Sequence, residues 1–165
     1  PAATHKKEQS MSDESKSFSR LKELIEMVKH GTELNVSAQT GDLLPVVVAY
    51  NREHNELHMV QIAVEGSEQL ARAIRTFLAE KDAASYALVI EGWATTFYEA
   101  AEAYDFEVSQ MPADDRWEMI QILAVERDGV KQSYEAKIIR VGDERELGEW
   151  KEIHNYDGRF VITEW

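Results

Sequence analysis

The sequence predicts an α+β domain, with an antiparallel or mixed sheet of five to seven strands and two main helices, mainly on one face of the sheet. Three observations lead to this fold class. Two segments carry apolar residues at helical spacing, several short runs are rich in Val, Ile, Tyr and Trp, and the middle of the chain holds a strong hairpin signal. The expected element order is helix, two strands, helix, strand, insertion and four strands.

The hairpin signal lies within residues 117–141, where Asp128 and Gly129 separate two β-prone runs. A two-residue type I′ turn at this pair would place Glu126 opposite Lys131, which is a favourable cross-strand charge pair. Counting outward from that turn gives one apolar face, which we expect to be core. Its members are Trp117, Met119, Leu123 and Val125 together with Val130, Tyr134, Ala136 and Ile138.

The two helices follow from apolar stripes. The first should run from about Ser17 to His30 and end at Gly31, because a glycine commonly follows a helix C-terminus. The second should have Ser67 as its N-cap and end near residues 81–84. Outside the central hairpin, strands are expected at residues 42–50, 57–64, 86–93, 147–154 and 159–165, with Pro45 at a strand start or a sheet edge.

The domain organisation is expected to be simple, since 165 residues are the size of one domain. Residues 1–16 form a polar tail, for which the composition predicts disorder in an isolated monomer. Residues 17–165 form a single α+β domain. An aromatic-rich insertion spans residues 94–116, where Thr96 and Glu99 fit a capping box and predict a short helix over 97–104.

Over residues 17–141, the order helix, hairpin, helix and three strands resembles that of roadblock and longin domains, which are small interaction modules. The resemblance lies in element order alone, and the insertion at 94–116 departs from it. What it implies, as an analogy of fold, is an interaction role.

Composition limits the classes of partner. The net charge is −13, so direct attraction to nucleic acid or to an anionic membrane is not expected. The acidic surface either serves solubility or mimics DNA. Cysteine is absent, which excludes disulfides and thiolate sites, and weakly favours a cytoplasmic location. No apolar run reaches the roughly 20 residues of a membrane helix.

Three candidate sites deserve weighing. His54 and His58 lie too far apart in an extended strand, roughly 13 Å, to share one metal ion, so we expect no metal and no cofactor. Glu91 is either a buried general acid or, as we favour, a strand-end carboxylate that reaches solvent beside a bulge at Gly92. An aromatic set with Glu91 forms either a ligand pocket or a small second core. This set is Trp93, Phe97, Tyr98, Tyr104, Phe106 and Trp117.

The function expected from these observations is that of a non-catalytic, acidic interaction or assembly subunit whose partner is a protein, either itself or another chain. A homo-oligomer is favoured, because the polar tail cannot order itself and the final strand would end on an uncovered Trp165. The alternatives are a small-molecule binding domain that uses the aromatic set and, ranked last, an enzyme that uses Glu91 with His54 or His58.

Overall fold

The computed structural model describes residues 2–38, 43–94, 116–154 and 160–165, with side chains from Arg20 onward. The helix predicted over 97–104 lies outside these residues. The described elements are two helices and seven strands. In chain order they are α1 (Ala2–Ala38), β1 (Val46–Asn51), β2 (Glu56–Gln61), α2 (Ser67–Glu80), β3 (Ser85–Ala94), β4 (Trp117–Glu126), β5 (Lys131–Val141), β6 (Glu144–Leu147) and β7 (Lys151–Ile153).

The strands form one antiparallel sheet, which confirms the α+β class. Their order across the sheet is β2-β1-β3-β4-β5-β6, and β7 also pairs with β5. All of the described pairs are antiparallel, so the mixed sheet that the sequence left open does not occur among them.

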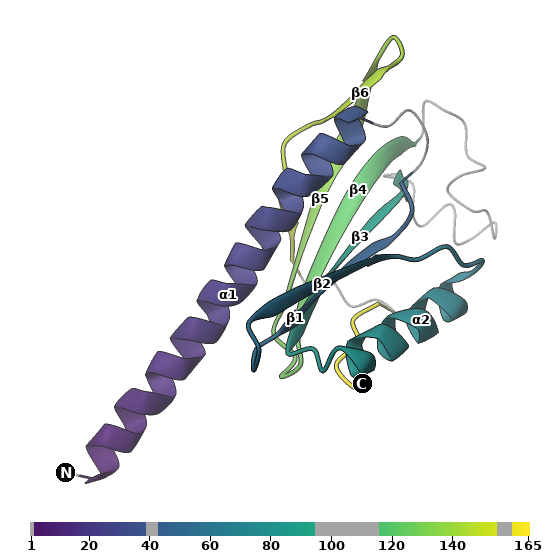
Figure 1. Ribbon diagram of the computed structural model, residues 1–165. Helices are drawn as coiled ribbons and strands as arrows, with labels where there is room; N and C mark the ends of the chain where they lie inside the picture. Colours follow the sequence, from purple (N-terminus) through teal and green to yellow (C-terminus); the bar gives the residue numbers. More distant parts are fainter. Residues whose placement is uncertain (1, 39–42, 95–115, 155–159) are drawn as a thin grey trace, which may run out of the picture.

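The helices cover opposite faces of the sheet, so the prediction that they lie mainly on one face is wrong (Figure 1). The reason lies in the central strands, whose alternate residues are apolar on both sides. In β3, Ala87 and Val89 pack towards α1, whereas Tyr86 and Leu88 pack towards α2. A sheet with two apolar faces needs a cover on each of them.

The central hairpin is confirmed, but its predicted register is wrong by one residue. Lys131 pairs with Val125 instead of Glu126, and the Glu126 N–H donates to the carbonyl of Val130 at 2.8 Å. The turn therefore has three residues, ending at Gly129, whose φ of 97° is the positive value that this turn requires. A type I turn followed by a bulge at glycine replaces the expected two-residue turn.

This one-residue shift redistributes the predicted core face between the two sides of the sheet. Ile120 and Ile122 pack towards α1 together with Ile138, whereas Leu123 and Val125 pack towards α2. The expected face had grouped Leu123 and Val125 with Ile138, so that grouping is wrong.

The helix boundaries differ from the predictions at both helices. α1 continues through Gly31 to Ala38, because Val36 lies fully buried one turn further on, and its backbone is helical through the segment for which the composition predicts disorder. The N-terminal part of α1 extends beyond the sheet (Figure 1). In α2, Gly66 is the N-cap and Ser67 is the first helical residue, so Ser67 is not the cap.

The predicted terminal strand over 159–165 is also wrong, since residues 160–165 have no strand structure and pack on the α2 side of the sheet. The buried Tyr86 hydroxyl holds this segment by donating to the carbonyl of Phe160 and accepting from the Ile162 N–H. The Trp165 ring stacks edge-on against Tyr86, and its indole N–H donates to the Ala83 carbonyl at 2.9 Å. Trp165 is therefore half-buried by its own chain, and it does not end an open strand.

Candidate functional site

The outer edge of β2 is open, since β1 is the only described strand that pairs with β2. The Ile62 N–H donates to the carbonyl of Pro45 directly opposite, so this is a hydrogen-bonded pair of the β1–β2 ladder. Bonded pairs alternate along an antiparallel ladder. His58 and Val60 therefore direct their backbone groups towards β1, whereas Leu57, Met59 and Gln61 direct theirs outward.

Leu57, Met59 and Gln61 also point their side chains to the α1 face of the sheet, because they stand opposite Tyr50, Val48 and Val46. Met59 is 72% exposed and Leu57 is 50% exposed, and Met27 of α1 lies beside them with 45% of its surface exposed. Single exposed apolar residues are ordinary, but a contiguous group indicates an interaction surface. Methionine suits such a surface, because its flexible thioether chain adapts to different partners.

Two hollows run along the boundary between α1 and β2 and meet at Met27. The first encloses about 270 Å³ and is lined by Arg20, Glu23, Leu24, Met27, Tyr50, Asn55 and Leu57. The second encloses about 230 Å³, and its apolar lining is Met27, Val28, Leu43, Leu44, Val46, Val48, Met59 and Val89. We call the two hollows together the α1–β2 groove.

The chain segment that contains β2 carries charge of one sign. Residues 53–71, which contain β2 and lead into α2, include four glutamates and neither Lys nor Arg. These glutamates are exposed: Glu53, Glu56, Glu65 and Glu68. The Arg20 guanidinium at one end of the groove donates to Asn55 at 3.0 Å and lies over the Tyr50 ring. Acidic residues along the β2 segment, next to an apolar groove, favour a basic, amphipathic partner.

Glu91 lies near the other end of the groove and is buried, so the favoured prediction of a solvent-reaching strand end is wrong. Its side chain is 7% exposed and pairs at 3.1 Å with Arg145, whose side chain is fully buried. The second carboxylate oxygen accepts the Leu43 N–H at 2.8 Å. The ladder continues regularly through Gly92, so the expected bulge is absent from this strand.

The Glu91 carboxylate therefore links three parts of the fold. It joins β3 to β6 through Arg145, and it fixes the chain that follows α1 through Leu43, which lines the groove. Its oxygens are occupied by structural partners, which is the ordinary state of a buried ion pair that holds elements together. Glu91 acts here as a positioning residue.

The two histidines do not lie in one extended strand, contrary to the assumption behind their expected separation. His54 is exposed in the β1–β2 turn, and His58 lies in β2 with its Nε2 at 3.3 Å from a carboxylate oxygen of Glu56. Within the described ranges, no group of three or more His, Cys, Asp or Glu side chains could hold a metal ion.

Of the predicted aromatic set, only the two tryptophans lie within the described residues, and the other four lie outside them. Trp93 pairs with Glu118 and Trp117 pairs with Ala94 in the β3–β4 ladder. Side chains alternate along a strand, so neighbouring pairs point to opposite faces of the sheet. Trp93 and Trp117 therefore do not line one surface.

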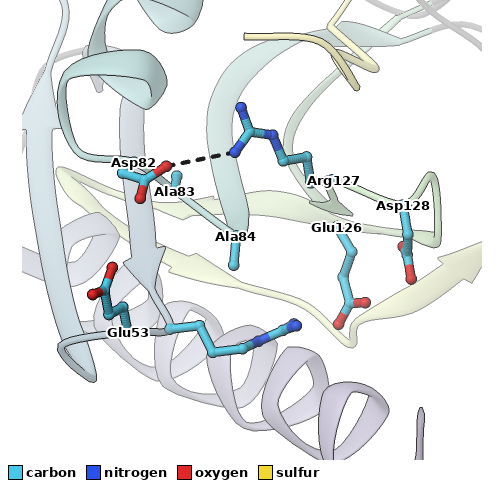
Figure 2. Close-up of a pocket in the computed structure, with 8 residues that line it drawn as sticks. Glu53, Asp82, Ala83, Ala84, Glu126, Arg127 and Asp128 are labelled. Carbon is cyan, nitrogen blue, oxygen red and sulfur yellow. Dashed lines mark ion pairs between the residues drawn. The ribbon is translucent and has the colours of Figure 1, made fainter. Parts of the chain in front are cut away.

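A further hollow of about 470 Å³ lies at the turn end of the sheet (Figure 2). Glu53 and Asp82 line it from two connections and Glu126 from the end of β4, and Arg127 of the β4–β5 turn pairs with Asp82 at 3.5 Å. Arg127 also donates to the Trp165 carbonyl at 2.6 Å. These contacts tie the β4–β5 turn to α2 and to the C-terminal segment, so the charges here serve the fold.

Tyr134 of β5 is the described titratable group with a shifted pKa. Burial raises the pKa of its phenol above the ordinary value, and the carboxylates of Glu152 and Glu26 raise it further. The Lys29 ammonium lies 3.8 Å from the ring centre. A phenol with a raised pKa stays protonated at neutral pH, so it is not a ready general base.

Comparison with known proteins gives no assignment, because no protein-family model, no curated protein and no solved structure matches the chain. The resemblance to roadblock and longin domains therefore stays a prediction from element order. Neither described helix has the length and apolar character that a membrane crossing requires.

Sequence reasoning missed the α1–β2 groove. The available signal was that Leu57 and Met59 occupy alternate positions of the second strand of a hairpin, which can lie at the edge of a sheet. Which strand is outermost depends on the pairing of β1 with β3, and that pairing cannot be read from local spacing.

Proposed function

We propose that the protein is a non-catalytic interaction subunit that binds another protein through the α1–β2 groove. The observation that carries this proposal is the exposure of Met59, Leu57 and Met27 beside an open strand edge. Burying such a surface removes apolar area from water, which contributes roughly 25 cal/mol per Å² before the costs of association.

The position of Glu91 supports a binding role over an enzymatic one. Its carboxylate is held by Arg145 and by the Leu43 N–H. His58 is paired through Ala49 with Tyr86, which lies five residues along β3 from Glu91, and His54 lies in the β1–β2 turn. A cytoplasmic location fits this role and remains part of the proposal.

A partner other than a second copy is favoured, because two chains that each carry a charge of −13 repel one another. Self-association is the second form of the proposal. Self-association was expected partly because Trp165 would be left uncovered at the end of a strand. This reason no longer holds, since Trp165 packs on its own sheet. Light scattering of the purified chain separates the two forms, with a monomer expected.

Site-specific photo-crosslinking tests the proposal. A photoreactive amino acid replaces Met59 in one variant and Val141 in a control, whose exposure of 65% is close to the 72% of Met59. In extracts of the source cells, we expect one discrete protein to be crosslinked from position 59 and not from position 141.

The crosslinked protein must then bind the purified chain, and Met59→Glu must weaken this binding at least about tenfold while Val141→Glu leaves it unchanged. Equal crosslinking from both positions, or binding that Met59→Glu leaves intact, would rule out the groove as the binding surface.

A further inference from the structure

We infer that the partner's binding segment is a basic, extended stretch of chain that adds to the sheet as an antiparallel strand beside β2. This inference rests on the proposed function and specifies how the groove is occupied. It requires an edge that offers backbone partners, side-chain space on one face, and charge of the opposite sign.

The backbone requirement is met by the alternation of the β1–β2 ladder. Leu57, Met59 and Gln61 direct their N–H and carbonyl groups outward, at the spacing that a paired strand presents. An added antiparallel strand would form bonded pairs with these residues. A docked helix has its own backbone hydrogen bonds and would leave these groups to water, so the geometry favours a strand.

The edge also lacks the features by which proteins usually block strand addition. β2 has no proline and no lysine, and its register with β1 continues unbroken from Glu56 to Gln61. Natural sheets protect an edge of this kind with lysine, proline, a bulge or a covering segment. Among the described residues none of these protects β2, and an edge of six residues is long enough to bind a partner strand.

The side-chain space lies on the α1 face. Residues of the added strand that stand opposite Leu57, Met59 and Gln61 point to the same face as these side chains. Alternate residues of a strand are about 7 Å apart, so two or three apolar side chains would enter the two hollows on either side of Met27.

The charge requirement identifies the remaining residues of the segment. Side chains on the other face of the added strand point towards the α2 side, where Glu65 and Glu68 follow β2 and Glu68 occupies the first turn of α2. Glu56 of β2 is on this same face, so Lys or Arg at these positions would be attracted to it. A second copy of β2 would instead bring another Glu56 and no Lys or Arg. The recognised pattern is thus apolar and basic residues in alternation.

A heptapeptide in which lysine alternates with valine and leucine, acetylated and amidated at its ends, is the probe. Two N-methylated versions provide a matched pair. Methylation on the apolar residues blocks the N–H groups that would face β2, whereas methylation on the lysines blocks the outward N–H groups. We expect the unmodified and lysine-methylated peptides to bind the full chain, and the apolar-methylated peptide to bind at least about tenfold more weakly.

Two protein variants give an independent test. Met59→Ala removes the side chain and keeps the outward N–H, whereas Met59→Pro removes both without breaking the ladder to β1. We expect the proline variant to bind the peptide at least about tenfold more weakly than the alanine variant. Thermal unfolding confirms that both variants are folded, and if Met59→Pro is not, the methylated peptides alone decide.

Equal binding of the two methylated peptides would overturn strand addition. In that case, the protein that crosslinks to position 59 could still bind the chain and lose this binding in Met59→Glu. That result would support the groove as an interaction site, so the two proposals fail separately. Peptide binding that Met59→Glu leaves unchanged would show that the peptide binds the acidic surface in general, and would also overturn the inference.

Discussion

Ile122 and Met59 belong to the same sheet and point towards the same face, yet Ile122 is fully buried and Met59 is 72% exposed. The difference comes from α1, which packs over β3, β4 and β6, whereas no element among the described residues covers Met59 of β2 to the same extent. Alternation along a strand sets which face a side chain joins. Its burial depends on whether another element covers that part of the face.

The largest expected difference between the two regions is in stability. Ile122→Ala should lower the free energy of unfolding by about 2–5 kcal/mol, because it removes buried atoms and leaves a cavity. Met59→Ala should change it by no more than about 0.5 kcal/mol, because the side chain is mostly in water. Guanidinium denaturation measures both, and a comparable loss in the two variants would mean that Met59 is covered.

The next largest loss of stability is expected at the buried ion pair of Glu91 and Arg145. Glu91→Gln should lower the free energy of unfolding by about 3 kcal/mol, since it removes the charge that faces the buried Arg145 guanidinium. Glu118→Gln is the matched control, because Glu118 pairs with Arg140, which is 47% exposed, and such a pair contributes at most about 1 kcal/mol. Equal effects in urea denaturation would mean that the Glu91 pair is solvated.

The smallest of the three predicted losses of stability is on the α2 face. Tyr86→Phe removes the hydroxyl that bonds Phe160 and Ile162, and should lower the free energy of unfolding by about 1–3 kcal/mol. Hydrogen exchange at the Ile162 amide should be faster in Tyr86→Phe, because this amide loses its acceptor. Tyr134→Phe removes a hydroxyl that makes a long contact of 3.4 Å to Gln132 and lies on the other face of the sheet, so it should leave the Ile162 amide unchanged.

The sequence predicted the parts of this fold that depend on local pattern. The α+β class, the element order through β5, and the central hairpin follow from apolar spacing and from the Asp128–Gly129 pair. The register failed because an Asp-Gly pair fits both a two-residue turn and a three-residue turn with a bulge, and local sequence does not separate them.

The candidate site depended on long-range pairing and could not be predicted. Glu91 was expected to reach solvent because its partner Arg145 is 54 residues away, in a strand that the pattern placed differently. To predict the groove at Met59, one must know that β1 pairs with β2 on one side and with β3 on the other, because this pairing makes β2 the outermost strand. Both facts belong to tertiary structure.

Residue-resolved hydrogen exchange of the isolated chain tests the central claim, that β2 has an open edge, most directly. The amides of His58 and Val60 bond to β1 and should exchange slowly, whereas those of Leu57 and Met59 face outward and should exchange much faster. Slow exchange at all four positions in the isolated chain would show that another segment or another copy already covers this edge, and would contradict the account.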